Sequence, residues 1–152
     1  MKQNLQKSNK DGLTFSKDDS SMKFLDTSFL IDVIRKSKSV KELLNEIDEY
    51  RPHVTNTIVA HEFLVGGYGA PNPEKELKIR NDLLSRIIIL NFDLDAANKS
   101  AQLEAELRKK GELNGGADML IAGNMRSRGI RTIVTKNTKH FEKISDIHIQ
   151  TW

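Results

Sequence analysis

Short apolar segments alternate with longer segments of helical periodicity along this chain, and the alternation strongly limits the folds it can adopt. A continuous β-branched run such as residues 87–90 is typical of a strand that is buried on both faces. Strands connected through helices pair in parallel, so we predict an α/β fold, a three-layer sandwich with a central parallel β-sheet. The expected strands are 23–26, 52–55, 87–90, 131–135 and 147–152.

Helical periodicity and capping residues delimit the segments between these strands. Asn56 or Thr57, and Asp93 or Asp95, stand where a helix N-cap is expected. A glycine-rich stretch, 66–69, is expected to stop one helix, and Gly129 to cap the C-terminal end of another. The expected helices span 29–35, 40–47, 58–65, 74–86, 94–110 and 117–128, with a short helical turn near 139–141.

The length and composition bound the domain organisation and the setting. Residues 1–21 are polar with almost no apolar side chains, so we expect a disordered N-terminal extension, followed by one folded domain over 22–152. The 152 residues contain no cysteine and no run that is apolar enough for a membrane span or a signal peptide, so we expect a cytoplasmic protein without membrane association. The net charge of +3 permits nucleic acid binding without requiring it.

Polar residues recur where the expected strands end. Asp26 ends the first strand, Glu62 lies about two turns into the helix after the second, Asp118 is in the first turn of the helix before the fourth, and Asn137 follows the fourth. In a parallel sheet all four positions map to one edge, where three carboxylates repel one another unless a cation lies among them. Mg²⁺ or Mn²⁺ prefers such oxygen ligands and can activate water for attack on a phosphodiester.

Each of these residues also has a structural interpretation when it is taken alone. Asp118 can complement the positive end of its helix, Asp26 can cap a strand end, Glu62 can be a solvated helix residue, and Asn137 can be a turn residue. The surroundings of Glu62 favour a site, because an acid among apolar neighbours is either a snorkelling surface residue or a site residue. Those neighbours are Ile58, Val59, Phe63 and Leu64.

Four short motifs, taken in their order along the chain, resemble the PIN-domain ribonucleases, and most closely their VapC-type toxins. The motifs are residues 25–32, 61–66, 118–122 and 134–137, and the resemblance extends over 22–152. It implies a PIN-like nuclease domain in which Asp26, Glu62 and Asp118 are catalytic residues and ligands of Mg²⁺ (or Mn²⁺). Asn137 is a further catalytic position, at which the family has Asp or Asn. Thr27 and Thr135 match positions that help to shape the site.

The same resemblance implies a function and partners. The chain would be a metal-dependent endoribonuclease that hydrolyses RNA phosphodiesters, and the toxin of a toxin–antitoxin pair. Expected partners are RNA, a small antitoxin protein and a second copy of the chain in a homodimer. An antitoxin arginine would suit the carboxylates, because its planar guanidinium can satisfy two of them. The helix that ends at Ile47, together with residues 63–65, would offer a groove for an amphipathic partner helix.

An alternative is a non-catalytic or receiver-like α/β binding domain in which Asp26 is structural or phosphorylated. A receiver would carry paired acids at the end of its first strand, whereas the acids here are spread over three elements. Asp32 is interpreted as a helix-packing residue or a surface partner of Arg35. The histidines lack metal-ligand spacing: His53, His61, His140 and His148. Several basic residues close to the acidic edge in sequence could follow an RNA backbone, namely Lys36, Lys38, Arg126, Arg128, Arg131, Lys136 and Lys139.

Overall fold

The computed structural model describes residues 22–47, 53–112 and 116–152 and contains a five-stranded parallel sheet. The strand order is β3-β2-β1-β4-β5, and every neighbouring pair is parallel, as the sequence predicts. The extension expected over 1–21 lies outside the described residues. The strands are β1 (Lys23–Leu25), β2 (Val54–Asn56), β3 (Ile88–Leu90), β4 (Thr132–Val134) and β5 (His148–Gln150).

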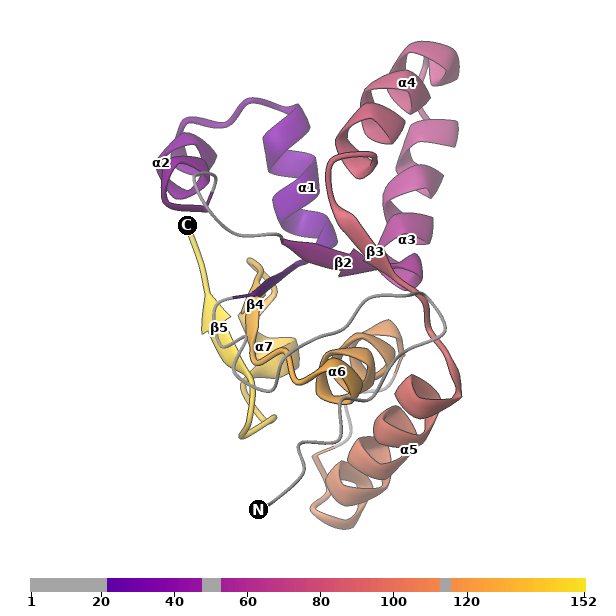
Figure 1. The fold of residues 1–152 in the computed structure, drawn as a ribbon, viewed down its shortest axis with the longest axis vertical. Coiled ribbons are helices and arrows are strands. Elements are labelled where there is room, and N and C mark those ends of the chain that lie inside the picture. The colour runs from indigo at the N-terminus through magenta and orange to yellow at the C-terminus, as the bar shows by residue number, and fades with distance from the viewer. Residues whose placement is uncertain (1–21, 48–52, 113–115) are drawn as a thin grey trace, which may run out of the picture.

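Helices cover both faces of the sheet, which confirms the predicted three-layer sandwich (Figure 1). In chain order, β1, β2 and β3 lie successively toward one edge of the sheet, and β4 and β5 lie on the other side of β1. Right-handed crossovers therefore place the helices of these two halves on opposite faces. No helix in the described part of the chain is long and apolar enough to cross a membrane. One face carries α1 (Thr27–Ile34), α2 (Lys38–Ile47), α3 (Thr57–Tyr68) and α4 (Pro73–Leu84), and the other carries α5 (Leu94–Lys109) and α6 (Ala117–Arg128), with α7 (Thr138–Phe141) beside α6.

The expected capping residues act as predicted. The Asn56 side chain accepts a hydrogen bond of 2.9 Å from the Val59 N–H at the start of α3. The Asp93 side chain accepts one of 3.0 Å from the Ala96 N–H at the start of α5. Gly129 follows α6 with φ of 71°, a left-handed conformation that glycine adopts without steric cost.

The prediction that residues 87–90 form a strand buried on both faces is wrong. β3 is an edge strand, and its middle residue Ile89 is 37% exposed. Ile89 lines an open hollow between α3 and α4, so these two helices cover the strand only in part. The β-branched run therefore indicated a strand correctly but not its place in the sheet.

The prediction that α3 stops at Gly66 is also wrong, because α3 continues through both glycines to Tyr68. Gly67 is the point at which α4 packs on α3: a Cβ atom there would lie 2.8 Å from the Arg80 Cδ and 2.9 Å from a Leu77 Cδ. Arg80 is buried, donates a hydrogen bond of 2.7 Å to the Phe63 carbonyl, and lies 4.6 Å above the Phe63 ring. Glycine thus serves close helix packing here.

A second close contact joins α6 to α5. A Cβ atom on Gly123 would lie 2.4 Å from the backbone N and Cα of Ser100, too close for any side chain. The Ser100 hydroxyl donates a hydrogen bond of 2.9 Å to the Met119 carbonyl in the same interface. The position of α6, which carries Asp118, is therefore set by backbone contact with α5.

We predict that Gly123→Ala destabilises the protein although alanine is the better helix former. Helix propensity favours alanine by about 1 kcal/mol, but overpacking against a rigid neighbour costs about 1–3 kcal/mol, and here the neighbour is backbone. The melting temperature, measured by circular dichroism, should fall by about 3 °C or more. The control is Gly69→Ala, where the new Cβ would lie 3.6 Å from the Val65 carbonyl oxygen and should leave stability almost unchanged. A Gly123→Ala protein as stable as the native chain would contradict the packing argument.

Candidate active site

The candidate site lies where the strand order reverses, at the carboxyl ends of β2, β1 and β4. Asp26 directly follows the central strand β1, and its backbone N–H donates to the Val134 carbonyl at the end of β4. Glu62 is on α3, which follows β2, and Asp118 is in the first turn of α6. Ligands of open α/β sheets bind in the crevice at such a reversal. The predicted common edge for these three acids is therefore the edge at which such sites form.

Two hydroxyls hold the Asp26 carboxylate, which is only 4% exposed. The Thr135 hydroxyl donates a hydrogen bond of 2.5 Å to Oδ2, and the Ser28 hydroxyl lies 3.3 Å from the same oxygen. Both hydroxyls are themselves positioned by backbone donors: Ser28 accepts from the Lys136 N–H, and Thr135 accepts from the Asn137 N–H. The segment after β4 is thus bonded to the carboxylate after β1.

The other two acids each have a partner from a distant segment. The Thr27 hydroxyl donates a hydrogen bond of 2.7 Å to Glu62 Oε2. The His140 Nδ1 lies 2.9 Å from Asp118 Oδ2, with the histidine side chain 51% exposed and the aspartate side chain 24% exposed. One oxygen of each carboxylate is therefore fixed by a neighbouring hydroxyl or imidazole. We call Asp26, Glu62 and Asp118 the acid cluster.

The acid cluster is coupled by charge. Burial raises the pKa of the Asp26 carboxyl, and the charge of Glu62 raises it further, against hydrogen bonds from Thr135, Thr27 and Ser28 that lower it. The pKa of Asp118 is also raised, first by burial and then by the charges of Asp26 and Glu62, while His140 opposes the shift. Three elements thus bring together carboxylates that repel one another.

Buried amides link the helices below the cluster. The Asn56 side chain, which caps α3, donates a hydrogen bond of 2.9 Å to the Asn124 side chain on α6. Asn124 in turn donates to the Asn91 carbonyl after β3, at 3.3 Å. Both side chains are fully buried, and an amide removed from water without these bonds would destabilise the fold. The helices that carry Glu62 and Asp118 are therefore tied to each other.

The donor set of the acid cluster fits a hard divalent cation, because its ligands are carboxylate oxygens whose mutual repulsion a cation would relieve. Among the residues that the structure describes, no three acidic or histidine side chains are already arranged so that they could hold a metal ion. Each of the three carboxylates instead has a separate partner: Thr135, Thr27 and His140. Asp26, Glu62 and Asp118 are the side chains that would hold an ion.

The other predicted site residue, Asn137, reaches the cluster through its backbone. Its N–H donates to the Thr135 hydroxyl at 3.0 Å, and the residue itself is exposed at the N-cap of α7. Its assignment as a catalytic residue stays a prediction. The hydroxyls of Thr27 and Thr135 contact the acids, as the family resemblance implies for these positions.

Sequence reasoning missed two groups at this edge. His140 lacks metal-ligand spacing, but it stands three residues after Asn137 on the short helix α7, which turns it toward Asp118. Asp32 pairs with Lys136 and accepts a hydrogen bond of 3.0 Å from the Trp152 indole N–H, whereas the expected partner Arg35 adds only a weaker charge effect. Neither contact follows from local spacing, because Lys136 is 104 residues away from Asp32.

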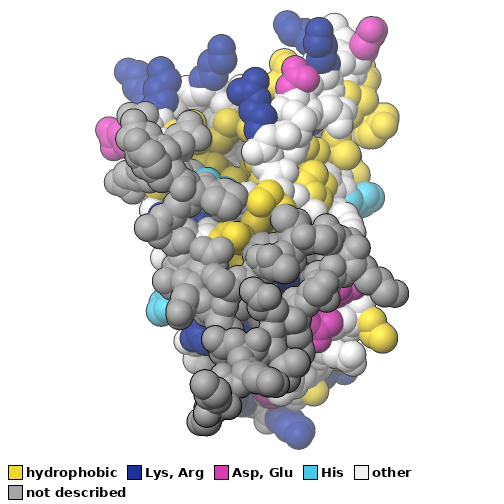
Figure 2. All heavy atoms as spheres, viewed as in Figure 1, with side chains coloured by type: hydrophobic (Ala, Val, Ile, Leu, Met, Phe, Trp, Pro, Cys, Tyr) yellow, Lys and Arg dark blue, Asp and Glu magenta, His cyan; other side chains and the backbone are white. Residues whose placement is uncertain are grey.

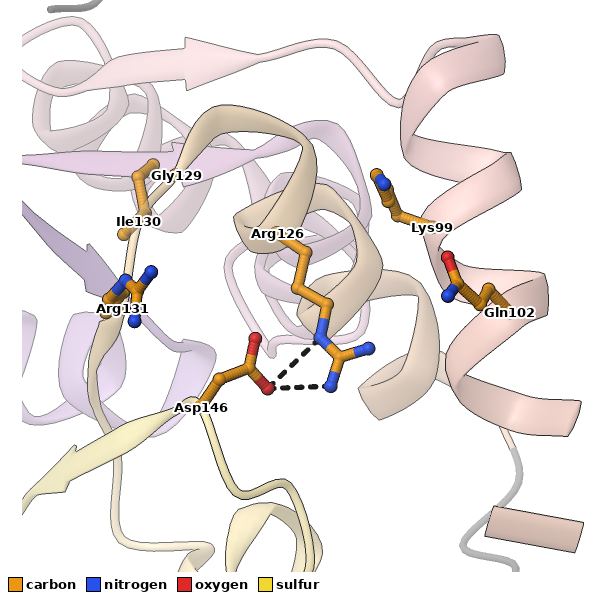
Figure 3. Close-up of a pocket in the computed structure, with 7 residues that line it drawn as sticks. All are labelled: Lys99, Gln102, Arg126, Gly129, Ile130, Arg131 and Asp146. Atoms are coloured by element: carbon orange, nitrogen blue, oxygen red, sulfur yellow. Dashed lines mark hydrogen bonds and ion pairs between the residues drawn. The ribbon is translucent and has the colours of Figure 1, made fainter. Parts of the chain in front are cut away.

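A separate cavity of about 260 Å³ lies at the opposite edge of the sheet, where β4 begins (Figure 3). One of its two arginines, Arg126, donates hydrogen bonds of 3.1 and 2.6 Å to Asp146, so much of the Arg126 charge is neutralised within the cavity. It shares no residue with the acid cluster and has no nucleophile or group of acids. Its lining residues are Lys99, Gln102, Arg126, Gly129, Ile130, Arg131 and Asp146.

Comparison with known families and curated relatives shows that the chain is similar to known nucleases. Residues 23–147 match the PIN domain family. The tRNA(fMet)-specific endonuclease VapC of Shigella flexneri is 35% identical over 129 residues, which cover 84% of this chain and 96% of that protein. Ribonuclease VapC2 of Haemophilus influenzae is 30% identical over the same coverage.

Solved structures of similar proteins share the fold of this chain. A DNA-bound VapBC complex from Salmonella typhimurium contains a chain that aligns with a TM-score of 0.76 at 31% identity, over 86% of this chain and 98% of that one. VapBC2 of Rickettsia felis, bound to a promoter DNA fragment, aligns with a TM-score of 0.78 at 25% identity and the same coverage. The fold is therefore shared over 86% of this chain and 98% of each of those chains.

We predict that Glu62→Gln stabilises the protein at neutral pH when a chelator removes metal ions. The change removes a charge that raises the pKa of both aspartates, while the amide oxygen can still accept the Thr27 hydrogen bond. A carboxyl whose pKa is raised by folding costs stability above that pKa, and the cost vanishes below the ordinary value of 3.8. The melting temperature should therefore rise by about 1–3 °C at pH 7, with the gain disappearing near pH 4.

The matched control is Glu42→Gln, an exposed glutamate on α2. This substitution removes the same charge far from the acid cluster and should change stability by less than about 0.5 kcal/mol at either pH. If Glu62→Gln is neutral or destabilising at pH 7, charge repulsion does not limit the stability of the cluster.

Proposed function

The chain belongs to the PIN-domain family and is a VapC-type endoribonuclease, the toxin of a toxin–antitoxin pair, and we propose that it hydrolyses RNA at the acid cluster with the help of Mg²⁺ or Mn²⁺. The observation that carries this proposal is the electrostatic coupling of three carboxylates at one edge of the sheet: the charge of Glu62 raises the pKa of both aspartates, and the charge of Asp26 raises that of Asp118. Such a group of carboxylates destabilises the fold by charge repulsion unless a bound cation offsets the charge.

The side chains around the cluster would position its oxygens for this chemistry. Thr135 and Ser28 hold one oxygen of Asp26, Thr27 holds one of Glu62, and His140 holds one of Asp118. Outer partners of this kind orient metal ligands and tune their basicity. A bound divalent ion supplies Lewis acidity and lowers the pKa of a water molecule that attacks the phosphodiester. Asn137 carries no charge, so its share in ion binding would be the weakest.

The alternative, a receiver-like domain with a phosphorylated Asp26, fits the site poorly. Phosphorylation needs an accessible carboxylate, whereas Asp26 is 4% exposed and its Oδ2 already accepts the Thr135 hydroxyl. The acids of the cluster also come from three separate elements. The nuclease assignment accounts for acids on three separate elements.

An antitoxin partner is proposed for this chain because its relatives in solved structures are VapBC complexes. The acid cluster suits an arginine of that partner, whose guanidinium can pair with two carboxylates. Of the apolar groove expected around residues 63–65, Phe63 is fully buried in the core, but Val65 is 56% exposed, and apolar side chains show along α3 and α4 in Figure 2. The Ile47 side chain, at the other end of the expected groove, lies outside the described part. The homodimer also stays a prediction.

We predict that RNA cleavage requires an added divalent ion and that Asp118→Asn lowers the cleavage rate at least about a hundredfold, because it removes a ligand charge. Asn137→Ala should cost less, since that residue is already neutral. The control is Asp95→Asn, which removes an exposed carboxylate in the first turn of α5. Cleavage is followed on labelled RNA by gel electrophoresis, and metal binding is followed separately through the rise in melting temperature with added Mg²⁺ or Mn²⁺.

The melting experiment keeps binding separate from activity. The native chain should be stabilised by the ion and the Asp118→Asn chain much less so. Full cleavage in chelator by protein free of contaminating ribonuclease, or an unaffected Asp118→Asn variant, would refute the metal-dependent mechanism.

We further predict that expression of the native chain alone arrests bacterial growth and that Asp26→Asn, at equal protein level, does not. If a small protein is encoded beside it, its co-expression should restore growth, and the two should co-purify. Growth curves and affinity purification measure both effects. A harmless native chain that binds no neighbour would refute the toxin assignment, while ribonuclease activity would still be decided by the cleavage experiment.

A further inference from the structure

A cation and an aromatic ring meet beside the acid cluster. The Lys136 ammonium pairs with the Asp32 carboxylate and lies 4.9 Å from the centre of the Trp152 ring. The Trp152 indole N–H donates a hydrogen bond of 3.0 Å to the same carboxylate, and the Phe29 ring packs edge-on against Trp152 at 5.3 Å. We call Asp32, Lys136 and Trp152 the rim cluster.

The backbone places the rim cluster next to the acids. Lys136 directly follows Thr135, whose hydroxyl donates to Asp26, and the Lys136 N–H donates to the Ser28 hydroxyl at 3.1 Å. The same residue therefore contributes its backbone to the wall of the acid cluster and its ammonium to the rim. A long side chain anchored in this way stays within reach of any group bound over the cluster.

The ammonium can leave Asp32 at low cost. The Lys136 side chain is 46% exposed, and ion pairs open to solvent contribute little to stability. Asp32 is more enclosed, at 16%, and keeps its hydrogen bond from the Trp152 indole when the lysine moves away. Asp32 is thus not left without a partner, and the pair can open.

RNA needs such a cation at this place. Its phosphates approach three carboxylates, of which Glu62 already raises the pKa of Asp26 and Asp118 by its charge, so the site repels a polyanion unless positive charge offsets it. Metal ions would neutralise the centre of the cluster. Lys136 supplies charge at its edge, where a neighbouring phosphate of the strand would pass.

We propose that Lys136 binds an RNA phosphate adjacent to the cleaved one, and that Asp32 and Trp152 hold its ammonium at the rim until the phosphate displaces Asp32. This inference rests on the proposed ribonuclease function. It makes opposite predictions for the two members of the ion pair: loss of the lysine weakens RNA binding, and loss of the aspartate charge strengthens it.

The experiment measures binding of a fluorescein-labelled single-stranded RNA of about 20 nucleotides by anisotropy, from about 50 to 200 mM salt. Asp26→Asn is the background that prevents cleavage, and Lys136→Met, Lys136→Arg and Asp32→Asn are added to it. Lys136→Met should weaken binding roughly fivefold at the lowest salt and reduce the slope of log affinity against log salt by about 0.7, the value for one phosphate contact on a single strand. Lys136→Arg should retain most of the affinity, and Asp32→Asn should tighten binding about twofold or more.

A purely structural role for the ion pair gives a different pattern, since Lys136→Met and Asp32→Asn would then weaken RNA binding together and leave the salt slope unchanged. That pattern, or an unaltered Lys136→Met variant, overturns the proposal. If the native chain still cleaves RNA in that case, only the role of Lys136 fails. If the native chain neither binds nor cleaves RNA, the proposed function fails and the role of Lys136 fails with it.

Discussion

The site depends on the burial of one carboxylate at the end of the central strand. Removing the Asp26 charge from water is costly, and the raised pKa of this group reflects that cost. The hydroxyls of Thr135 and Ser28 and the Thr27 N–H offset part of the cost. These donors are in place only because β1 and β4 pair in the register that sets Leu25 opposite Val134. Sheet register therefore places the donors that offset the cost of burying this carboxylate.

The remaining acids depend on how firmly two helices are held. α6 is pressed on α5 through Gly123 and Ser100, and it is bonded to the cap of α3 through Asn124 and Asn56. Neither contact involves an acid of the cluster. Both fix the positions of the helices that carry Asp118 and Glu62, so helix packing outside the site determines its geometry.

Much of this could be predicted from the sequence, because the signals were local. The alternation of strands and helices, the caps Asn56 and Asp93, and the order of the acids along the chain each lie within a few residues. The failures needed information from distant segments. The edge position of β3 depends on strand order, and the continuation of α3 through Gly67 depends on Arg80 and Leu77 of the next helix. The contacts of His140 with Asp118 and of Lys136 with Asp32 also join distant segments, and the sequence did not predict them.

The sequence separation of the contact between Thr135 and Asp26, 109 residues, has a consequence for synthesis of the protein. A ribosome that has translated β1, α3 and even α6 has made every acid of the cluster, but it has not yet supplied the threonine that holds the central one. The nascent chain therefore cannot complete its site until almost all of it has emerged and the last strands have joined the sheet. A nascent chain that lacks Thr135 therefore contains Asp26 without the hydroxyl that holds its carboxylate in the folded protein.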